Sequence, residues 1–148
     1  MNFANRVFGI VVTLLLGISI QVAAQDDLIP KRQKLMKSNS AANKAIKSAV
    51  GKKDYAAVEA KAKEIANNMG QLEALFPKGS TSDKSRAKAA IWEKWDEFTK
   101  DAEGAKMAAN DLAAAAAAKD EAEVGAKFKV LGKSCGGCHK PFRAPKKK

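Results

Sequence analysis

The chain has 148 residues, of which 46% are hydrophobic and 6% aromatic, and its 27 lysine and arginine residues outnumber 16 acidic ones, giving a formal net charge of +11. A chain of this length suits a single domain with one modest hydrophobic core. The positive charge would let the protein dock on an acidic protein or an anionic membrane surface, but no nucleic-acid-binding motif accompanies it, so we exclude nucleic acid as the partner.

The first 24 residues have the pattern of a secretory signal peptide. Arg6 supplies a positive charge, residues 7–20 are uncharged and mostly apolar, and Val22-Ala23-Ala24 provides small residues before the cut. The apolar stretch is shorter than the ~18–20 residues of a membrane-spanning helix. The alternative to a cleaved signal peptide is an uncleaved membrane anchor. We therefore predict export to the periplasm, no stable membrane insertion after cleavage, and a mature domain of residues 25–148.

Apolar residues recur at spacings of three and four through most of the mature chain, which predicts helices rather than strands. Four helical segments are expected, at residues 28–49, 55–72, 91–116 and 124–142. The spacing is unbroken in the last three segments, whereas Arg32 and Asn39 interrupt the apolar face of the first. A polar residue at such an inward position indicates either the end of a helix or a functional site.

Turn and capping residues separate these segments. Gly51 ends the first segment, and Asp54 is a candidate N-cap for the second. Ser82 or Asp83 is expected to cap the third, and Asp120, with an acidic residue three positions later, resembles a capping box for the fourth. Short connections make neighbouring helices antiparallel, so we predict an all-α, antiparallel up-down four-helix bundle.

The sequence Cys135-Gly136-Gly137-Cys138-His139 is the C-x-x-C-H signature of covalent haem attachment. On a helix, residues at positions i, i+3 and i+4 share a face. Two thiols there can each form a thioether to a haem vinyl group, and the imidazole then lies under the iron. Because His139 is the only histidine in the chain, it is the only possible histidine ligand. We predict one covalent haem c per chain, held by two thioethers.

Two other readings of the cysteine pair are weaker. A structural zinc site needs about four ligands, and this sequence offers three with no second cluster. A thioredoxin-like dithiol lies at a helix N-terminus after a strand, whereas this pair falls near the end of a long helical pattern. Haem attachment is therefore the favoured interpretation.

With His139 on one side of the iron, the other axial position is left to methionine, lysine, water or nothing. Met36, Met69 and Met107 remain after the signal peptide is removed. Met69 occupies an apolar position where filling a gap is the default role, and Met107 lies off the apolar positions of its segment. Met36 belongs to the segment with polar inward positions, which makes it the candidate ligand, with an ordinary core residue as the alternative.

Several patterns together resemble class II c-type cytochromes, the cytochrome c-prime family. They are Arg32-Gln33-x-x-Met36-Lys37, Leu75-Phe76-Pro77-x-Gly79-Ser80, Ile91-Trp92-x-x-x-x-x-Phe98 and Cys135-x-x-Cys138-His139-x-x-Phe142-Arg143. The resemblance covers essentially the whole mature chain and implies a four-helix bundle with its haem site near the C-terminus. Members of the family are often dimers through their first two helices, so the resemblance also implies a homodimer.

The first of these patterns resembles the low-spin cytochrome c-556 branch, in which the methionine binds iron. The resemblance therefore implies Met36 as a metal ligand alongside His139. It also implies that Arg32 and Arg143 lie near the haem propionates, where a guanidinium suits a carboxylate.

Taken together, these features predict a periplasmic carrier of single electrons that exchanges them with redox partner proteins, acidic ones if charge governs the encounter. The alternative is a high-spin cytochrome c-prime with an open sixth position that binds or handles nitric oxide or carbon monoxide. The two differ in whether Met36 binds the iron. We do not expect an enzyme, because no second histidine is available for acid–base work.

Overall fold

The computed structural model describes residues 17–146, with side chains placed from residue 28 onward. Residues 1–16 of the predicted signal peptide lie outside this range, so the cleavage at residue 24 stays a prediction. Within the described range, no helix is both long and apolar enough to cross a membrane.

The first helix, α1 (Gly17–Gly51), buries the face that the sequence pattern predicts. The apolar side chains of that face are Ile29, Leu35, Ala42, Ile46 and Ala49. Arg32 lies on the same face and is also buried, with 4% of its surface exposed. The helix is followed by a tight turn in which Lys53 adopts a left-handed conformation (φ 57°).

The second helix, α2 (Tyr55–Gly70), begins at the predicted cap. The Asp54 carboxylate accepts a hydrogen bond from the backbone N–H of Ala57 at 3.0 Å, which satisfies one of the free donors of the first turn. A short 3₁₀ helix, η2 (Glu73–Leu75), then leads into a loop that spans residues 76–89.

The predicted third helix is wrong at its start. Residues 91–116 were expected as one helix, but the structure divides them into α3 (Ala90–Glu93) and α4 (Trp95–Ala117), because Lys94 leaves the helical conformation (φ −125°, ψ 51°). The expected caps at residues 82 and 83 are also wrong, since both lie in the loop.

The last long helix is α5 (Glu121–Phe142). Its N-cap is Asp120, as predicted, with a 3.0 Å hydrogen bond from the backbone N–H of Glu123. Beyond its end the C-terminal tail pairs with the loop: the N–H of Ala144 donates to the carbonyl of Arg86 at 2.8 Å, and the N–H of Lys88 donates to the carbonyl of Phe142 at 3.0 Å. These bonds explain why the loop is not helical around residues 86–88, since its backbone groups bond to the tail.

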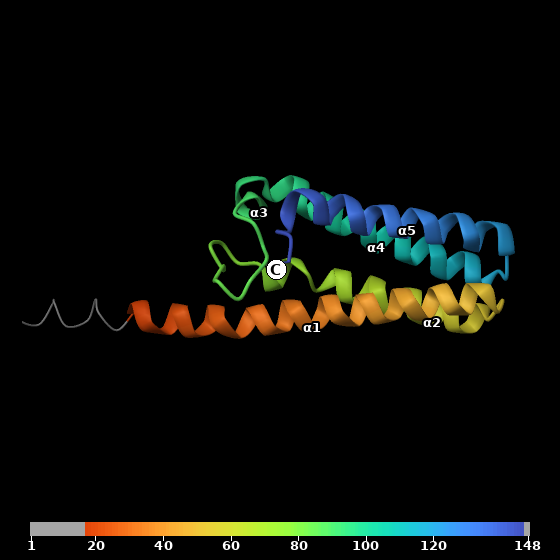
Figure 1. Cartoon of the computed structure of the whole chain (residues 1–148), viewed down its shortest axis with the longest axis horizontal. Helices are drawn as coiled ribbons and strands as arrows, with labels where there is room; N and C mark the ends of the chain where they lie inside the picture. The colour runs from red at the N-terminus through yellow and green to blue at the C-terminus, as the bar shows by residue number, and fades with distance from the viewer. Residues whose placement is uncertain (1–16, 147–148) are drawn as a thin grey trace, which may run out of the picture.

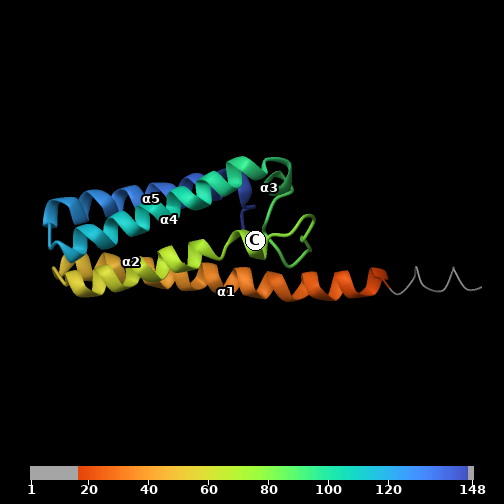
Figure 2. The same cartoon turned by 180° about the vertical axis from the view of Figure 1, so that it is seen from behind.

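The four long helices form the predicted antiparallel up-down bundle, but they do not close it evenly (Figure 1). α1 packs on α2, α2 on α4, and α4 on α5. The α1–α2 pair and the α4–α5 pair lie close together at the end that holds their connecting turns. They diverge toward the other end, where the C-terminal tail lies (Figures 1 and 2). The bundle therefore opens between α1 and α5, at the end that carries the C-x-x-C-H sequence.

Candidate haem cavity

A cavity of about 630 Å³ occupies the open end of the bundle, within the range of volumes usual for cofactor sites. Side chains from α1, α2, α4, α5 and the loop line it, and most of the lining is apolar. All six residues singled out from the sequence lie on its wall: Arg32, Met36, Cys135, Cys138, His139 and Arg143. The fold therefore brings together residues that are about 100 positions apart in the chain.

The two cysteines lie one helical turn apart on α5, half-buried and without a disulfide between them. Burial raises the pKa of the Cys135 thiol, and it raises the pKa of Cys138 to about 11, with a further contribution from the charge of Asp101. A redox dithiol of the thioredoxin type needs the opposite, a thiol of lowered pKa at a helix N-terminus. The structure thus disfavours the dithiol alternative on both grounds.

His139 follows in the last turn of the same helix and is also half-buried. Burial lowers the pKa of its imidazole, and the charges of Arg143 and Arg86 lower it further. The neutral imidazole, which is the form that binds metals, is therefore favoured at neutral pH. In residues 28–146, no three histidine, cysteine or acidic side chains gather in a way that could hold a metal ion by themselves, which leaves the zinc alternative without a site.

Arg32 reaches from α1 to the segment that follows α2, a role that the sequence did not reveal. Its Nε donates to the carbonyl of Leu75 at 2.5 Å, and Nη2 donates to the hydroxyl of Ser80. The guanidinium also lies 4.1 Å from the ring centre of Phe76. Arg32 therefore holds the start of the loop against α1, which explains why an arginine occupies an inward position.

The remaining nitrogen of Arg32, Nη1, is buried and has no hydrogen-bond partner. Burial lowers the pKa of the guanidinium to about 10, so the side chain is still charged at neutral pH. A buried cation without an anion costs free energy. This nitrogen is thus available to a carboxylate inside the cavity, although only one of the three guanidinium nitrogens is free.

Arg143 sits at the mouth of the cavity in an extended conformation, directly after α5. Its backbone N–H donates to the carbonyl of His139 at 3.0 Å, and the residue forms an isolated bridge with Ala87 of the loop. Its side chain is exposed. The two arginines therefore lie at different depths, one buried in the wall and the other at the opening.

Both Met36 and Met69 line the cavity, but their sulfur atoms differ in their surroundings. The Asn39 side-chain amide donates to the sulfur of Met69 at 3.4 Å and accepts a hydrogen bond from Asn68 at 2.8 Å. Among the described residues, no hydrogen bond reaches the sulfur of Met36. Met107, as expected from its register, is exposed (59%).

Aromatic side chains form the wall beside α4 and α5. The ring centres of Phe76 and Phe142 lie 5.0 and 5.5 Å from that of Phe98. The Trp92 indole N–H donates to the carbonyls of Phe76 and Pro77 at 3.1 and 2.9 Å, so Trp92 anchors the loop from outside. The structure thus places Trp92 at the loop.

Sequence reasoning missed the contribution of the loop itself. Residues 84–87 line the cavity, together with the polar side chains Ser40 and Asn43 of α1. The loop has no apolar periodicity that could have placed it. For Ser40 and Asn43 a signal existed, because they fall four and seven residues after Met36 and so extend the same face of the helix.

Comparison with known proteins identifies the family. Residues 27–143 match the family model described as Cytochrome C'. A cytochrome c' of Pararhodospirillum photometricum is 39% identical over 82% of this chain and 99% of its own length. A cytochrome c-556 of Agrobacterium tumefaciens is 35% identical over 80% of this chain and 98% of its own length. The solved cytochrome c prime of Shewanella frigidimarina superposes with a TM-score of 0.76 and 25% identity, covering 82% of this chain and 97% of that one. The chain belongs to the cytochrome c-prime family.

Proteins of this family are haem proteins that carry electrons or bind gases, rather than classical enzymes, and they hold one covalent haem c in a four-helix bundle. This chain is accordingly a haem c protein. The cavity fits such a group in three respects: its volume, the thiol pair one helical turn apart on its wall, and the buried guanidinium nitrogen that lacks an anion.

Proposed function

We propose that the protein carries single electrons in the periplasm through one haem c, with His139 and Met36 as the axial ligands of the iron. The observation that carries the proposal is the lining of the cavity, to which α5 contributes Cys135, Cys138 and His139 and α1 contributes Met36. The haem supplies the one-electron chemistry when it is bound. The protein's residues attach it, ligate it, neutralise its carboxylates and limit access to it.

Attachment falls to the two cysteines. They are the only cysteines in the chain, and their spacing on α5 presents both sulfur atoms to one side of the cavity. Gly136 and Gly137 between them are exposed and have open space around them. The thioethers therefore form on the inner face of α5, and His139 follows one residue later with a neutral imidazole.

Met36 is the better candidate for the second axial position because the sulfur of Met69 already accepts a hydrogen bond. A lone pair engaged by an amide N–H is less available to iron. Methionine ligation raises the reduction potential, and a filled position excludes small gases. It also keeps the coordination the same in both oxidation states, so little has to rearrange when an electron arrives.

Arg32 and Arg143 are proposed to hold the two propionates. Arg32 offers its free Nη1 inside the wall, and Arg143 offers an exposed guanidinium at the mouth. A charge-assisted hydrogen bond of this kind is stronger than a neutral one, and it would relieve the cost of the buried cation.

The second candidate is a gas-binding protein with an open sixth position. Relatives named cytochrome c' and relatives named cytochrome c-556 align with this chain at similar identity, 39% and 35% in the two cases above. The part of the cavity wall formed by α1 is also partly polar. It includes Asn43, whose buried Oδ1 has no hydrogen-bond partner in the described range. In this case Met36 would pack against the haem without binding the iron.

Two measurements test the proposal. Haem should stay on the polypeptide after denaturation and acid extraction with organic solvent, as thioethers require, and release of all haem would contradict the attachment. Absorption spectra of the ferric and ferrous protein should be low-spin and nearly unchanged by carbon monoxide. A high-spin ferrous spectrum that shifts with carbon monoxide would instead support the gas-binding candidate.

The proposal extends to the surroundings of the protein. Residues 1–24 would direct export and then be removed. A homodimer is also proposed, and one solved cytochrome c' that is 29% identical to this chain, with a TM-score of 0.76, is described as showing ligand-controlled dimer dissociation. Sedimentation of the purified holoprotein would test the homodimer.

A further inference from the structure

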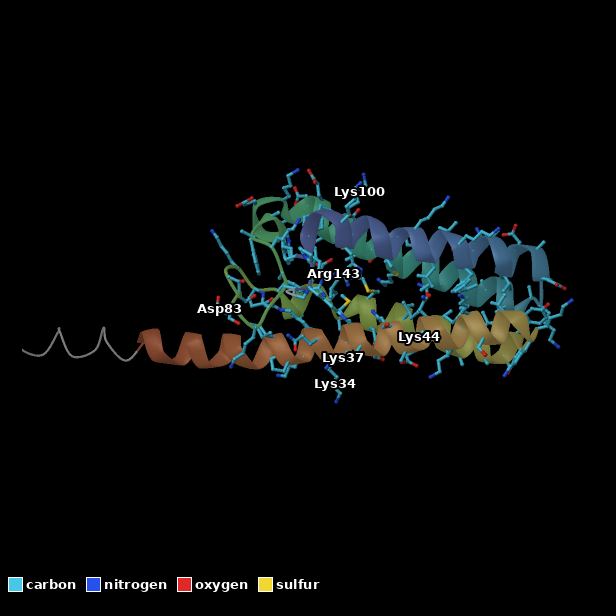
Figure 3. The ribbon with its side chains drawn as sticks, viewed as in Figure 1. Lys34, Lys37, Lys44, Asp83, Lys100 and Arg143 are labelled. Atoms are coloured by element: carbon cyan, nitrogen blue, oxygen red, sulfur yellow. The ribbon has the colours of Figure 1, made fainter. Side chains whose placement is uncertain are left out.

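The mouth of the cavity is surrounded by positive charge. Five basic side chains line it, and we call them the basic rim: Lys37, Lys84, Arg86, Arg143 and Lys146. All are exposed except Arg86, which is partly buried. No aspartate or glutamate of the described residues lines the cavity. Figure 3 shows Lys37 on α1 and Arg143 in the opening between α1 and α5.

The rim charges are not neutralised by the protein. None of the five forms an ion pair within residues 28–146, whereas lysines elsewhere on the helices do, such as Lys61 with Glu64 at 2.8 Å. At the opposite end of the bundle, positive and negative charges are equal in number in the connecting turns. Its two turns, residues 51–54 and 118–121, hold three lysines and three acidic residues. Five basic side chains without an ion-pair partner in residues 28–146 therefore surround the cavity.

Hydrogen bonds hold the parts of the rim together. The Arg86 guanidinium donates through Nε and Nη2 to the carbonyl of Ala144, at 2.8 and 2.5 Å. The Gln33 side chain on α1 donates to the carbonyl of Lys84 at 2.9 Å. Three segments that are distant in sequence, α1, the loop and the C-terminal tail, are thus tied to one another. The backbone that carries these cations has a defined geometry.

We propose that the basic rim is the docking surface for an acidic redox protein. The inference rests on the electron-carrier function proposed above and names the place and chemistry of its partner. Electrons reach a cofactor in this cavity most directly through the mouth, so a partner must approach there. Opposite charges around that point speed the encounter and orient it. An anionic lipid surface at the same place would cover the mouth and exclude that partner, so we favour a protein.

The test compares two charge-reversal variants of the holoprotein. The rim variant carries K37E, K84E and K146E, and the control variant carries K47E, K52E and K119E near the other end. All six lysines are exposed, and none forms an ion pair in the described range. Both variants therefore change the net charge equally. The two arginines of the mouth are left intact, because they are assigned to the haem or to the tail.

The probe is a reduced plant-type [2Fe–2S] ferredoxin, an acidic one-electron donor, mixed with the ferric protein in a stopped-flow instrument. At an ionic strength of about 0.1 M the screening length is about 10 Å. Charges at the far end of the bundle therefore have little effect on a partner that approaches the mouth. We expect the second-order rate constant to fall about tenfold in the rim variant and less than about twofold in the control. The rate for the native protein should also decrease as salt is added.

Equal losses in both variants, or no loss in the rim variant, would overturn the proposal. Rim-dependent binding to phosphatidylglycerol vesicles with an unchanged ferredoxin rate would overturn it in favour of a lipid partner. Spectra and reduction by an uncharged quinol should be nearly the same in all three proteins, and the midpoint potential of each is measured so that a change in driving force is separated from a change in docking. If the native protein is reduced slowly even by the quinol, the electron-carrier function fails independently of the rim.

Discussion

Met36 and Met69 face one cavity from two different helices, and a single hydrogen bond separates their roles. The amide of Asn39 donates a hydrogen bond to the sulfur of Met69, whereas no hydrogen bond in the described range reaches the sulfur of Met36. In the proposed ligation, the choice between the two methionines therefore depends on local hydrogen bonding as well as on position.

Met36→Leu should change the iron while leaving the fold intact. Leucine keeps nearly the same volume, so the cost in stability should be below ~1.5 kcal/mol. The iron should become high-spin, bind carbon monoxide and have a lower midpoint potential, as absorption spectroscopy and redox titration would report. Met69→Leu is the matched control and should leave the spectrum unchanged. If the effects of the two substitutions are reversed, Met69 is the ligand.

Arg32 has two roles that substitution can separate. Arg32→Met keeps the unbranched aliphatic part of the side chain but leaves the Leu75 carbonyl and the Ser80 hydroxyl without this donor. We expect a loss of about 2–3 kcal/mol in the free energy of unfolding, measured by chemical denaturation of the holoprotein. Ser80→Ala removes only one of these bonds and should cost about 1 kcal/mol.

If Nη1 of Arg32 neutralises a propionate, only Arg32→Met should also raise the pKa of that carboxyl and make the midpoint potential vary more with pH near neutrality. An Arg32→Met variant as stable as the native protein would show that the hydrogen bonds from Arg32 to Leu75 and Ser80 do not stabilise the fold. An unchanged pH dependence of the potential would remove Arg32 from the propionate.

At the scale of the helices, the N-caps are the features in which sequence and structure agree most closely. The carboxylates of Asp54 and Asp120 each accept a hydrogen bond from a backbone N–H three residues later, at 3.0 Å in both cases. Each should contribute about 1 kcal/mol, so Asp54→Ala and Asp120→Ala should lower the free energy of unfolding by that amount. Asp83→Ala, in the exposed loop, is the control and should have no effect beyond ~0.5 kcal/mol. A control loss as large as the cap losses would refute the assignment.

These caps could be predicted because they depend on residues that are adjacent in sequence. The start of the third helix could not, because residues 86–88 bond to the C-terminal tail, more than 50 positions away. The break at Lys94 has no signal in the apolar spacing, which continues through it. The cysteine pair and His139 were predictable because the chemistry fixes their spacing, whereas the loop residues of the mouth follow no such rule.

At the scale of the whole molecule, the bundle is incomplete without a cofactor. The cavity separates α1 from α5 at one end, while α2 packs on α4 toward the other. An empty cavity costs roughly 24 cal/mol per Å³. Even if only half of the 630 Å³ counts as enclosed, the cost is on the order of 8 kcal/mol, comparable with the entire stability of a small domain.

We therefore expect the haem-free chain to be helical but loosely packed. A variant with Cys135→Ser and Cys138→Ser, which keeps His139, would provide this chain when it is produced without haem. Its far-ultraviolet circular dichroism should remain helical, while the near-ultraviolet signal of Trp92 and Trp95 beside the open end should be lost. Heating should give a broad transition in place of the sharp one of the holoprotein.

Hydrogen exchange would locate the loss of packing. Amides of α2 and α4 near the closed end, around the fully buried Val58 and Leu112, should retain protection. Amides around Arg32 and His139 should lose protection from exchange, because the hydrogen bonds of Arg32 and the end of α5 both border the cavity. A cooperative melt equal to that of the holoprotein, with uniform protection along the bundle, would mean that the helices close over the empty site and that the cofactor is not part of the core.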